Sequence, residues 1–577
     1  MSSDDRPGSG TWFSEVEAAR VVDGPEQIAW TDEADLVVVG YGGAGVSAAV
    51  EAAERGASVI ALDRFHGGGA TAMNGGVFYA GGGTVIQKEA GVDDTPDEMF
   101  KYLQMEVQGV VSDRTLRRFC DESPALIDWM MAHGVRFNSR YYPKKTSYPT
   151  PEWYLYHSDS TLAPAYAAVA KPAARGHRVY LPAGNTAVGY GVGLYQPLRD
   201  AADRLGVKVL AKADARQLVV DGAGRVLGVK VLQIPPGTPE AAEHDALETK
   251  GFKLLLSFPP AYPGAKIFIA RARRYLDKAR DIELKHRVER FIRARKGVCL
   301  SAGGFIFNRA MVAHLAPDYA KGMPLGSPAD DGGGIRLGQT AGGAVDRMWH
   351  VSAWRFINPP TAWAQGILVD GRGERYVNEM LYGAAIGLEM CQARGGRGYL
   401  ILGKALRREA WRQLRREKIL PFQRYPAMLA MLFGAKKSAT LEGLARECGF
   451  DPAVLKATAA TYDAAGAGAA DPFGKAAEDV PGLGAGPYLA VDMSIDAQFA
   501  PLPTLTLGGL KVDEDTGAVL DAGGAPIAGL YAAGRNAIGV CSNIYVSGLS
   551  ASDCVFSGRR VGEHVAAQAG RAASAAA

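Results

Sequence analysis

The clearest pattern of apolar positions lies between residues 35 and 63. A continuous apolar run, Leu36–Val39, is typical of a strand that is buried on both faces of a parallel sheet. An alanine-rich stretch follows and ends at Gly56, because glycine favours the end of a helix. A second apolar run, Val59–Leu62, then leads to Asp63. The pattern therefore predicts a βαβ unit over residues 35–63.

Weaker patterns predict further elements on both sides of this unit. Thr95, Pro96 and Glu98 have the order of a helix N-cap, a first-turn proline and a capping-box acid. Alternating apolar positions favour strands, two of which would form a hairpin. We expect helices that begin at Thr95 and at Ser123, the latter ending near Gly134, and helices at 196–205 and 549–562; strands at 207–213, 215–221, 226–232 and 297–304; a loop-like segment at 137–180; and a frayed tail from Val565. The loop-like segment is rich in aromatic residues, which would line an apolar pocket or pack on the core.

Residues 233–296 differ in character from their surroundings. A proline-broken apolar stretch, Phe252–Tyr262, precedes a segment that we expect to be helical from Ile267 onward. Its basic residues outnumber its acids and are Arg271, Arg273, Arg274, Lys278, Arg280, Lys285, Arg287, Arg290, Arg293, Arg295 and Lys296. Residues 250–296 could therefore contact an anionic membrane surface. A solvated helical insertion or a contact between subunits would have the same pattern.

Composition narrows the classes of function. The chain has 577 residues, enough for more than one domain, and its net charge of +3 gives no global field that would favour nucleic acid. The six cysteines are far apart, so neither a disulfide framework nor a metal site is indicated. The chain start lacks the features of a secretory signal, and no apolar run approaches the roughly 20 residues that span a bilayer. We expect a cytoplasmic protein.

The turn after the first predicted strand carries candidate chemistry. Gly40, Gly42 and Gly45 form a G-x-G-x-x-G pattern, in which glycine allows a tight turn and close approach of the backbone to a pyrophosphate. The N–H groups at the helix start would face the phosphates. Asp63 ends the next strand about 20 residues later, where a carboxylate binds a ribose hydroxyl. A glycine-rich turn alone is weak evidence, but all four features in register predict a dinucleotide site.

Two other glycine-rich regions extend this prediction. Residues 67–76 combine glycines with Thr71 and Asn74, which suits backbone lying against a flat or anionic ligand. Near the other end, residues 529–548 are also rich in glycine and precede the helix expected from Leu549. The start of that helix could hold a negative group of the same ligand.

With both glycine-rich ends taken together, the chain resembles the flavoprotein family of fumarate reductase and the 3-ketosteroid dehydrogenases. The resemblance runs from about residue 35 to residue 562, without most of 233–296. Within that family the chain is most similar to the 3-ketosteroid Δ4-(5α)-dehydrogenases. The segments that carry the resemblance are Gly81–Thr84, Ala174–His177, Gly373–Glu379 with Tyr382, Leu507–Leu510, Ala533–Arg535 and Tyr545–Ser547.

The resemblance implies an α/β fold with FAD as the cofactor. A Rossmann-type FAD-binding domain would be built from both chain ends, residues 30–310 and 490–577, around an inserted α+β substrate or cap domain at 311–489. FAD should be bound non-covalently, because the segment Gly68–Met73 lacks the histidine that links FAD in membrane-bound relatives, and His66 has the wrong offset. The residues expected to bind FAD are Gly40, Gly42, Gly43, Ala44, Gly45, Asp63, Arg64, Gly69, Ala70, Thr71, Asn74, Gly75, Gly76, Ala215, Ala302, Gly303, Gly534, Arg535 and Ser550.

The segment Asn543–Ser547 indicates the class of substrate. Fumarate reductases place an arginine in this loop to bind a carboxylate, whereas this chain has a phenol and a hydroxyl, which suit a neutral carbonyl. The resemblance therefore implies desaturation beside the ketone of a 3-oxosteroid. One group polarises the carbonyl, a base removes the adjacent proton, and hydride passes to flavin N5.

The resemblance assigns this chemistry to Tyr382, Tyr545 and Ser547. Tyr545 would accept the proton with help from Tyr382, and Ser547 would orient the substrate. Because the unperturbed pKa of tyrosine is about 10, a second phenol or a helix dipole would have to favour the phenolate. The pair Val546–Ser547 after the second tyrosine favours the Δ4 type, since the Δ1-dehydrogenases have Pro-Gly there.

Two alternatives stay open on the sequence alone. One is a 3-ketosteroid Δ1-dehydrogenase or a related flavin enzyme that reduces a steroid-like enone. The other is a flavin-holding membrane scaffold that uses the basic segment as its functional surface, in which the tyrosines and the serine would be superfluous. The electron acceptor is not identified.

Overall fold

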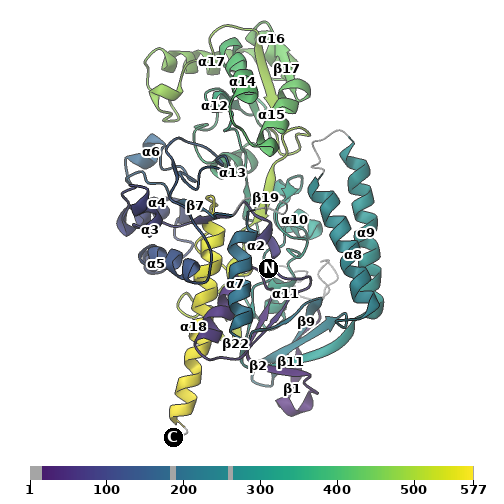
Figure 1. Ribbon diagram of the computed structural model, residues 1–577. Coiled ribbons are helices and arrows are strands. Elements are labelled where there is room, and N and C mark those ends of the chain that lie inside the picture. Colours follow the sequence, from purple (N-terminus) through teal and green to yellow (C-terminus); the bar gives the residue numbers. More distant parts are fainter. Residues whose placement is uncertain (1–15, 182–189, 258–263, 576–577) are drawn as a thin grey trace.

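The computed structural model describes residues 16–181, 190–257 and 264–575, and its fold is mixed α/β (Figure 1). A large sheet covered by helices fills the lower part of Figure 1. An upper part is built from the middle of the chain, and a long helical hairpin lies along one side. The purple and yellow ends of the chain lie side by side against the sheet, so both ends build the same part of the molecule.

The large sheet has the strand order β1–β9–β10–β11–β2–β3–β8, and β22 and β21 extend it from β11. Strands β2, β3 and β8 are parallel, as the predicted βαβ unit requires. The predicted hairpin is formed by β9 and β10. The bounds are β1 Arg20–Val22, β2 Asp32–Val39, β3 Val59–Leu62, β8 Lys208–Leu210, β9 Ala213–Asp221, β10 Val226–Gln233, β11 Val288–Leu300, β21 Ala518–Leu520 and β22 Pro526–Ala532.

Strand β11 joins the two parts of this sheet. Its first half pairs antiparallel with β10, and its second half pairs parallel with β2 and β22. Glycine is required at position 297, because a Cβ atom there would lie 2.5 Å from the ring of Tyr531. The strand begins at Val288, well before the predicted start at 297, so the charged residues in between belong to the sheet.

The prediction of one basic helix up to Lys296 is wrong. Helix α9 ends at His286, and the basic residues that follow lie in or beside β11. Acids of β2 neutralise the basic residues of this strand. In the sequence alone, the same run of charges is typical of a solvated helix. The pairs are Arg290–Asp32, Arg293–Glu33, Arg295–Glu33, Arg295–Asp35 and Lys296–Asp35.

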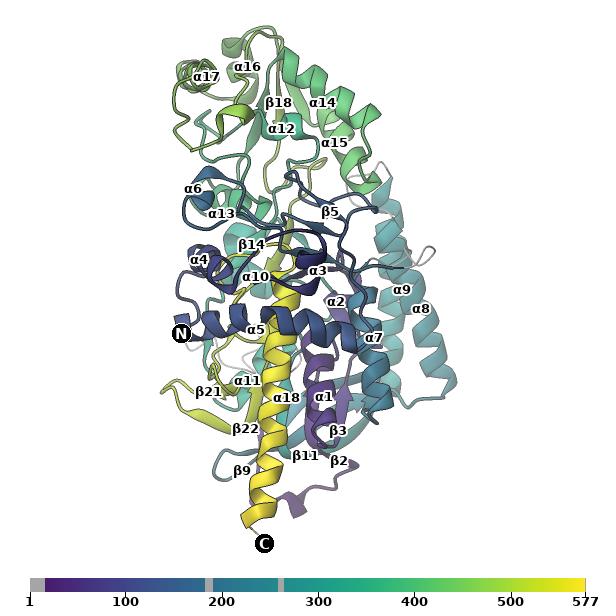
Figure 2. The same ribbon diagram turned by 60° about the vertical axis from the view of Figure 1, so that its left-hand side comes forward.

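Helices α1 and α18 pack side by side on the large sheet, and α7 contacts α1 (Figure 2). Glycines of α18 allow a close approach: a Cβ atom on Gly558 would lie 2.3 Å from the carbonyl oxygen of Ala44. Helix α18 continues past the predicted end at 562, and Val565, predicted to lie in a frayed tail, is fully buried. The bounds are α1 Gly43–Glu54, α7 Val192–Arg204 and α18 Leu549–Ala575.

The segment predicted to be loop-like, 137–180, contains short strands. Strands β5, β6 and β7 form a small sheet with β4, in the order β4–β7–β6–β5. Helix α5 crosses α18 beside this sheet (Figure 2). The bounds are α2 Gly69–Met73, β4 Val77–Tyr79, α3 Val85–Glu89, α4 Pro96–Val107, α5 Asp113–Ala132, β5 Tyr141–Tyr142, β6 Leu155–Tyr156, α6 Pro164–Ala167 and β7 Gly176–Arg178.

Helix starts follow the prediction in part. The N-cap at Thr95 is confirmed, because its hydroxyl accepts the N–H of Glu98 at 3.2 Å. The predicted helix start at Ser123 is wrong: α5 begins at Asp113 and passes through Pro124. Proline lacks only one backbone donor, and tertiary packing of α5 outweighs this loss.

The upper part of Figure 1 contains the sheet β15–β16–β18–β17 with the surrounding helices α14 to α17. Strand β19, in the sheet β12–β19–β14, lies between this part and the large sheet. Strands β13 and β20 pair separately. The bounds are α10 Arg309–Leu315, β12 Met323–Pro324, α11 Gly333–Thr340, β13 Val345–Asp346, β14 Val351–Ala353, α12 Thr361–Ala364, β15 Ile367–Val369, α13 Gly383–Ala393, β16 Tyr399–Leu402, α14 Lys404–Arg416, α15 Pro421–Phe433, β17 Ala435–Ser438, α16 Leu441–Cys448, α17 Pro452–Gly466, β18 Tyr488–Asp492, β19 Pro503–Thr506 and β20 Gly509–Leu510.

Helices α8 (Pro239–Ser257) and α9 (Ala265–His286) form the hairpin at the side of the molecule (Figures 1 and 2). The predicted apolar stretch at 252–262 is the end of α8 up to Ser257, and the rest of it lies outside the described residues. In the described part of the chain, none of the helices combines the length and the apolar character that crossing a membrane requires.

Candidate active site

The glycines predicted to approach a dinucleotide lie at the end of β2 and the start of α1. Gly40 has a φ of +93°, and a Cβ atom there would lie 2.5 Å from the Cα atom of Ala302. A Cβ atom on Gly45 would lie 2.1 Å from the carbonyl oxygen of Gly40. Gly42 is the N-cap of α1, which begins with Gly43. Side chains at Gly40 and Gly45 would separate β2, β11 and α1, so the backbone stays open toward a ligand.

Helix α2 lies next to this turn. The Oγ1 atom of Thr71 accepts the N–H of Gly43 at 3.1 Å, so α2 lies close to the start of α1. The Asn74 side chain accepts the N–H of Gly76 at 2.7 Å, which shapes the exit from α2. The predicted residues here are Gly69, Ala70 and Thr71 in the helix and Asn74, Gly75 and Gly76 after it.

Asp63 lies directly after β3, where a ribose-binding acid was predicted. Its carboxylate accepts the N–H groups of Tyr41 and Phe65, each at 2.9 Å. A carboxylate has further acceptor sites, so Asp63 keeps the capacity to bind a hydroxyl. The side chain of Arg64 donates to Asp331 at 3.0 Å. Arg64 therefore ties this loop to the residues before α11.

The opposite wall of the site comes from the ends of other strands. Ala302 and Gly303 follow β11, and Gly534 follows β22, which is parallel to β11. These residues therefore meet at the same edge of the sheet. A Cβ atom on Gly534 would lie 2.8 Å from the Cβ atom of Ala44 on α1. Ala215 lies within β9 and Ser550 in the first turn of α18.

Two side chains at this edge have buried polar atoms without hydrogen-bond partners among the described residues. Asn536 is fully buried, and both its Oδ1 and its Nδ2 are unsatisfied. The Nη2 atom of Arg535 contacts both carboxylate oxygens of Asp330 at 3.0 Å, whereas its Nη1 is unsatisfied. Each unsatisfied buried polar group costs about 1–3 kcal/mol. A polar ligand with donors and acceptors, such as FAD, fits these residues and the glycine turn.

The three predicted catalytic residues come together from distant parts of the chain. Tyr382 is the N-cap of α13, and Tyr545 and Ser547 precede α18. The Oγ atom of Ser547 lies 3.2 Å from the hydroxyl of Tyr156, and the Tyr382 side chain also hydrogen-bonds Ser547. We call Tyr156, Tyr382, Tyr545 and Ser547 the tyrosine cluster.

Backbone hydrogen bonds to one loop position this cluster. The N–H of Ser547 donates to the carbonyl of Ser158 at 3.2 Å, and the Ser158 hydroxyl donates to the carbonyl of Ser547 at 3.1 Å. The N–H of Tyr382 donates to the Ser160 hydroxyl at 2.9 Å. The loop after β6 therefore connects the N-terminus of α13 to the segment before α18.

Tyr545 has an aromatic and a polar neighbour. Its ring lies against Trp354, with ring centres 4.5 Å apart and an angle of 32° between the planes. Its hydroxyl accepts the N–H of Gly548 at 3.4 Å. Gly548 directly precedes the long helix α18, so the positive end of the helix dipole lies next to this hydroxyl.

Burial controls the ionisation of the tyrosine cluster. It raises the pKa of Tyr382, Tyr156 and Tyr545 far above the ordinary value of tyrosine. The N–H of Gly548 opposes the rise in the pKa of Tyr545, and hydrogen bonds with Ser547 oppose it for the other two. A phenolate in this cluster therefore needs further stabilisation by positive charge.

Sequence reasoning missed Tyr156 and Trp354 as individual site residues. Tyr156 is fully buried and belongs to the aromatic segment 137–180. The interpretation of that segment as the lining of an apolar pocket therefore included Tyr156. Trp354 follows β14 and carried no local signal. Its position depends on the sheet β12–β19–β14, which no sequence motif predicted.

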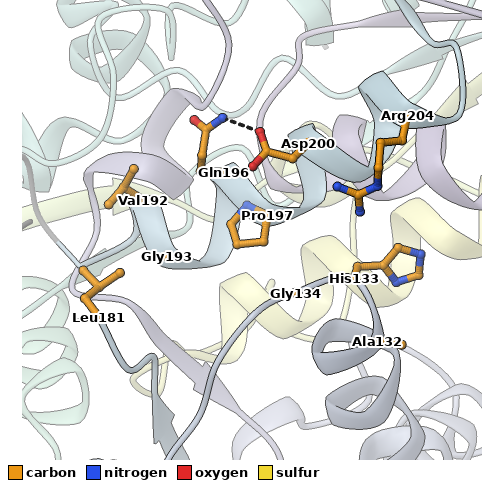
Figure 3. Close-up of a pocket in the computed structure, with 10 residues that line it drawn as sticks. All are labelled: Ala132, His133, Gly134, Leu181, Val192, Gly193, Gln196, Pro197, Asp200 and Arg204. Carbon is orange, nitrogen blue, oxygen red and sulfur yellow. Dashed lines mark hydrogen bonds between the residues drawn. The ribbon is translucent and has the colours of Figure 1, made fainter.

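A surface cleft away from the cluster has a volume of about 350 Å³ (Figure 3). It lies between the end of α5 and α7, and the Gln196 side chain donates to Asp200 at 2.8 Å on its wall. None of the predicted site residues lines this cleft. We therefore assign it no part in the chemistry.

His66, Asp245 and Glu248 have ligand atoms within 4.8 Å of one another, a spacing compatible with a metal ion. Asp245 already pairs with His66 at 2.7 Å and with Lys212 at 2.9 Å. The Lys212 ammonium would repel a cation at this position. This group therefore gives no reason to predict a metal site.

Comparisons with known proteins find relatives that match most of this chain. The sequence model described as "FAD binding domain" matches residues 35–548. A 3-oxo-5-alpha-steroid 4-dehydrogenase from Comamonas testosteroni is 37% identical over 522 residues, which cover 88% of this chain and 94% of the relative. A 3-oxosteroid 1-dehydrogenase from Mycolicibacterium smegmatis is 26% identical over 592 residues, covering 89% and 93%.

A solved structure has the same fold over almost the whole chain. It is the crystal structure of 3-ketosteroid-delta4-(5alpha)-dehydrogenase from Rhodococcus jostii RHA1 in complex with 4-androstene-3,17-dione. The TM-score is 0.78 at 30% sequence identity, and the match covers 95% of this chain and 100% of the other.

Proposed function

We propose that this chain, which belongs to the FAD binding domain family, is an FAD-dependent dehydrogenase of 3-oxosteroids that introduces a double bond conjugated to the C3 ketone. The observation that carries the proposal is the tyrosine cluster, in which three phenols and the hydroxyl of Ser547 meet next to the start of α18. Relatives that match most of this chain are named as steroid dehydrogenases of the Δ4 and Δ1 types. We favour the Δ4-(5α) type.

The proposed cofactor site is the glycine turn after β2, α2 and the strand ends at Ala302 and Gly534. FAD would be held there without a covalent bond, since the segment Gly68–Met73 offers no histidine. A Rossmann-type FAD domain from both chain ends, with residues 311–489 as a cap domain, is the arrangement that we infer. The pairing of β22 with β11 and the contact of α18 with α1 support it.

The tyrosine cluster would remove the proton next to the ketone. Tyr545 is the proposed base, because its hydroxyl accepts the N–H of Gly548 at the positive end of α18. Tyr382 and Tyr156 would assist Tyr545 with their phenol groups. Ser547 lies between these two tyrosines. When bound, FAD supplies the acceptor for the hydride at N5.

The same cluster explains the choice of a neutral substrate. Asn543, in the loop where fumarate reductases place an arginine, accepts a hydrogen bond from Arg347 at 2.8 Å. Its amide also donates to the carbonyl of Glu106 at 2.7 Å. Asn543 therefore has a supporting role, and the hydroxyl of Ser547 remains to orient a carbonyl oxygen.

Anaerobic mixing with two classes of steroid tests the proposal. We expect saturated 5α-3-oxosteroids to bleach the flavin absorbance within one turnover and 3-oxo-4-ene steroids to leave it unchanged. Bleaching by the 4-ene steroids alone would indicate the Δ1 type. If neither class bleaches the flavin, the steroid assignment fails.

We also propose peripheral contact with an anionic membrane through residues 250–296. The support is now limited to the α8–α9 hairpin, because the basic residues of β11 are paired with acids. On α9, Ile267 is 74% exposed and lies beside the exposed Lys266, with exposed Arg273 and Arg274 further along the helix. An apolar side chain among cations suits an interface with anionic lipid.

Sedimentation with phospholipid vesicles tests this contact. Deleting 250–296 would remove β11, so charge reversal is the better change. We expect the wild type to pellet with anionic vesicles and the triple variant Lys266→Glu, Arg273→Glu, Arg274→Glu to remain in solution. The control reverses three exposed arginines of α14, namely Arg408, Arg415 and Arg416. Equal pelleting of the wild type and the α9 variant would exclude this surface.

A further inference from the structure

We propose that Lys145 acts on the proposed reaction through Tyr382: its ammonium group, held over the Tyr382 ring, favours ionisation of the tyrosine cluster, and the Glu106 carboxylate opposes this effect. The role rests on the proposed function, because it concerns the proton that the substrate loses. We call Lys145, Glu106 and Asp159 the charge cluster. The sequence analysis assigned no function to any of the three.

The geometry of Lys145 is defined on two sides. Its Nζ atom lies 5.9 Å from the centre of the Tyr382 ring, within the range of a cation–π contact. The same Nζ donates a short hydrogen bond to the carbonyl of Asp159. The carbonyl of Lys145 itself accepts a hydrogen bond from Asn358 at 3.5 Å. The ammonium is therefore held at a fixed place next to the proposed site of chemistry.

The two acids of the charge cluster are buried. Asp159 is fully buried, and its carboxylate accepts the hydroxyls of Tyr79 at 2.9 Å and Thr161 at 2.7 Å. Glu106 is 2% exposed, and it accepts the hydroxyl of Tyr102 at 2.6 Å. Lys145 is half-buried beside these two buried acids, so solvent screens the interaction of the three groups only in part.

Two of these groups change charge near neutral pH. Burial lowers the pKa of Lys145 to about 8, although the charges of Asp159 and Glu106 oppose this shift. Burial raises the pKa of Glu106 to about 7, although its hydrogen bond with Tyr102 opposes the rise. As pH rises through this range, Glu106 gains a negative charge and Lys145 then loses its positive charge.

The other charged and titratable groups around Lys145 and Tyr382 do not take over the effect of Lys145 and Glu106. Arg175 pairs with Asp94 at 2.7 Å, so together they add no net charge. His157 hydrogen-bonds Tyr141 at 2.8 Å, and burial lowers its pKa. The groups that face the pair are Glu106 and Tyr102 from α4, Tyr79 from β4, Asp94 before α4, His157 and Asp159 after β6, Tyr166 from α6, Arg175 before β7, and Tyr156, Tyr545 and Ser547 of the tyrosine cluster.

The physical effect follows from the burial of the phenols. Burial raises the pKa of Tyr382, and the negative charge of Asp159 raises it further. A positive charge close to an acid favours its charged form and so lowers its pKa. The Lys145 ammonium offsets part of both effects. Protonation of Glu106 strengthens that offset, because it removes one of the two negative charges that oppose the ammonium.

The role predicts opposite pH shifts for two variants. The measurement is the rate of anaerobic flavin reduction by a saturated 5α-3-oxosteroid as a function of pH in a single turnover. For Lys145→Met we expect the rise in rate to move to higher pH by about one unit, and for Glu106→Gln to lower pH. Lys145→Arg keeps the positive charge above pH 8 as well, so it should not show the upward shift of Lys145→Met. Coincident profiles for wild type, Lys145→Met and Glu106→Gln would overturn the role.

Unfolding of the FAD-loaded protein gives a readout that does not depend on turnover. A double-mutant cycle of Lys145→Met and Glu106→Gln should show non-additive changes in stability at pH 7, because the two charges interact. Additive changes together with unshifted pH profiles would overturn the proposal. If Lys145→Met does not fold, Glu106→Gln alone decides it, since an unshifted profile contradicts the role. A wild type that no steroid reduces would overturn the proposed function, and this role with it.

Discussion

At the scale of single residues, proton removal depends on Tyr545. The change Tyr545→Phe removes the hydroxyl that accepts the N–H of Gly548 but keeps the ring against Trp354. We expect the rate of flavin reduction by a saturated 5α-3-oxosteroid to fall by about 10²–10⁴-fold, the usual contribution of a positioned base. FAD content and thermal stability should remain those of the wild type. Tyr180, which is 39% exposed, provides the control Tyr180→Phe. Reduction of the Tyr545 variant at the wild-type rate would exclude Tyr545 as the base.

Glu106 also makes the stability of the fold depend on pH. Burial raises its pKa from 4.5 to about 7. The folded protein therefore binds a proton that the unfolded chain has lost, and stability falls as pH rises from about 4.5 to about 7. The change Glu106→Gln should remove this loss, at most about 3 kcal/mol. Urea unfolding at pH 5 and pH 8 checks it; the same pH dependence in wild type and variant would contradict the account.

Functional residues could be predicted from the sequence where their role depends on residues that are close in the chain. Gly40 and Gly45 lie in a short motif whose backbone must approach its neighbours, and the tyrosines of the resemblance are found in the cluster. Lys145 and Glu106 could not be predicted in the same way. They become important only because β5, α4 and α13 place them around Tyr382, and no spacing in the sequence contains that information.

At the scale of elements, close packing of α1 and α18 brings the two halves of the proposed cofactor site together. A Cβ atom on Gly558 would lie 2.3 Å from the carbonyl oxygen of Ala44. We expect Gly558→Val to destabilise the protein by about 1–3 kcal/mol and to weaken retention of FAD, because the helices must move apart. Gly222→Ala, in the turn after β9 with open space around it, is the control. Unfolding and flavin content equal to those of the control would contradict this packing argument.

Elements whose partners are far away in sequence were the hardest to predict. The βαβ unit at 35–63 was correct because its strands and helix are consecutive. Strand β11 was mistaken for a basic helix, since Asp32, Glu33 and Asp35 neutralise its cations from a neighbouring strand. Helix α5 passes through Pro124 for a similar reason: contacts with α4 and α18 outweigh the local preference.

At the scale of the whole molecule, the arrangement joins segments from both chain ends and from the middle. The glycine turn comes from the N-terminal part, Tyr545 from the C-terminal part and Tyr382 from the residues between them. Removal of a proton and a hydride from one substrate requires the base and the cofactor site to lie next to the same substrate. The membership of the FAD binding domain family fits it, because that family supplies the hydride acceptor.

Identification of the product tests the central claim most directly. One equivalent of a saturated 5α-3-oxosteroid is mixed anaerobically with the FAD-loaded protein, and the steroid is analysed by mass spectrometry and NMR. We predict loss of two hydrogens per flavin and a new double bond between C4 and C5. A double bond between C1 and C2 would contradict the Δ4 assignment, and an unchanged steroid would contradict the account as a whole.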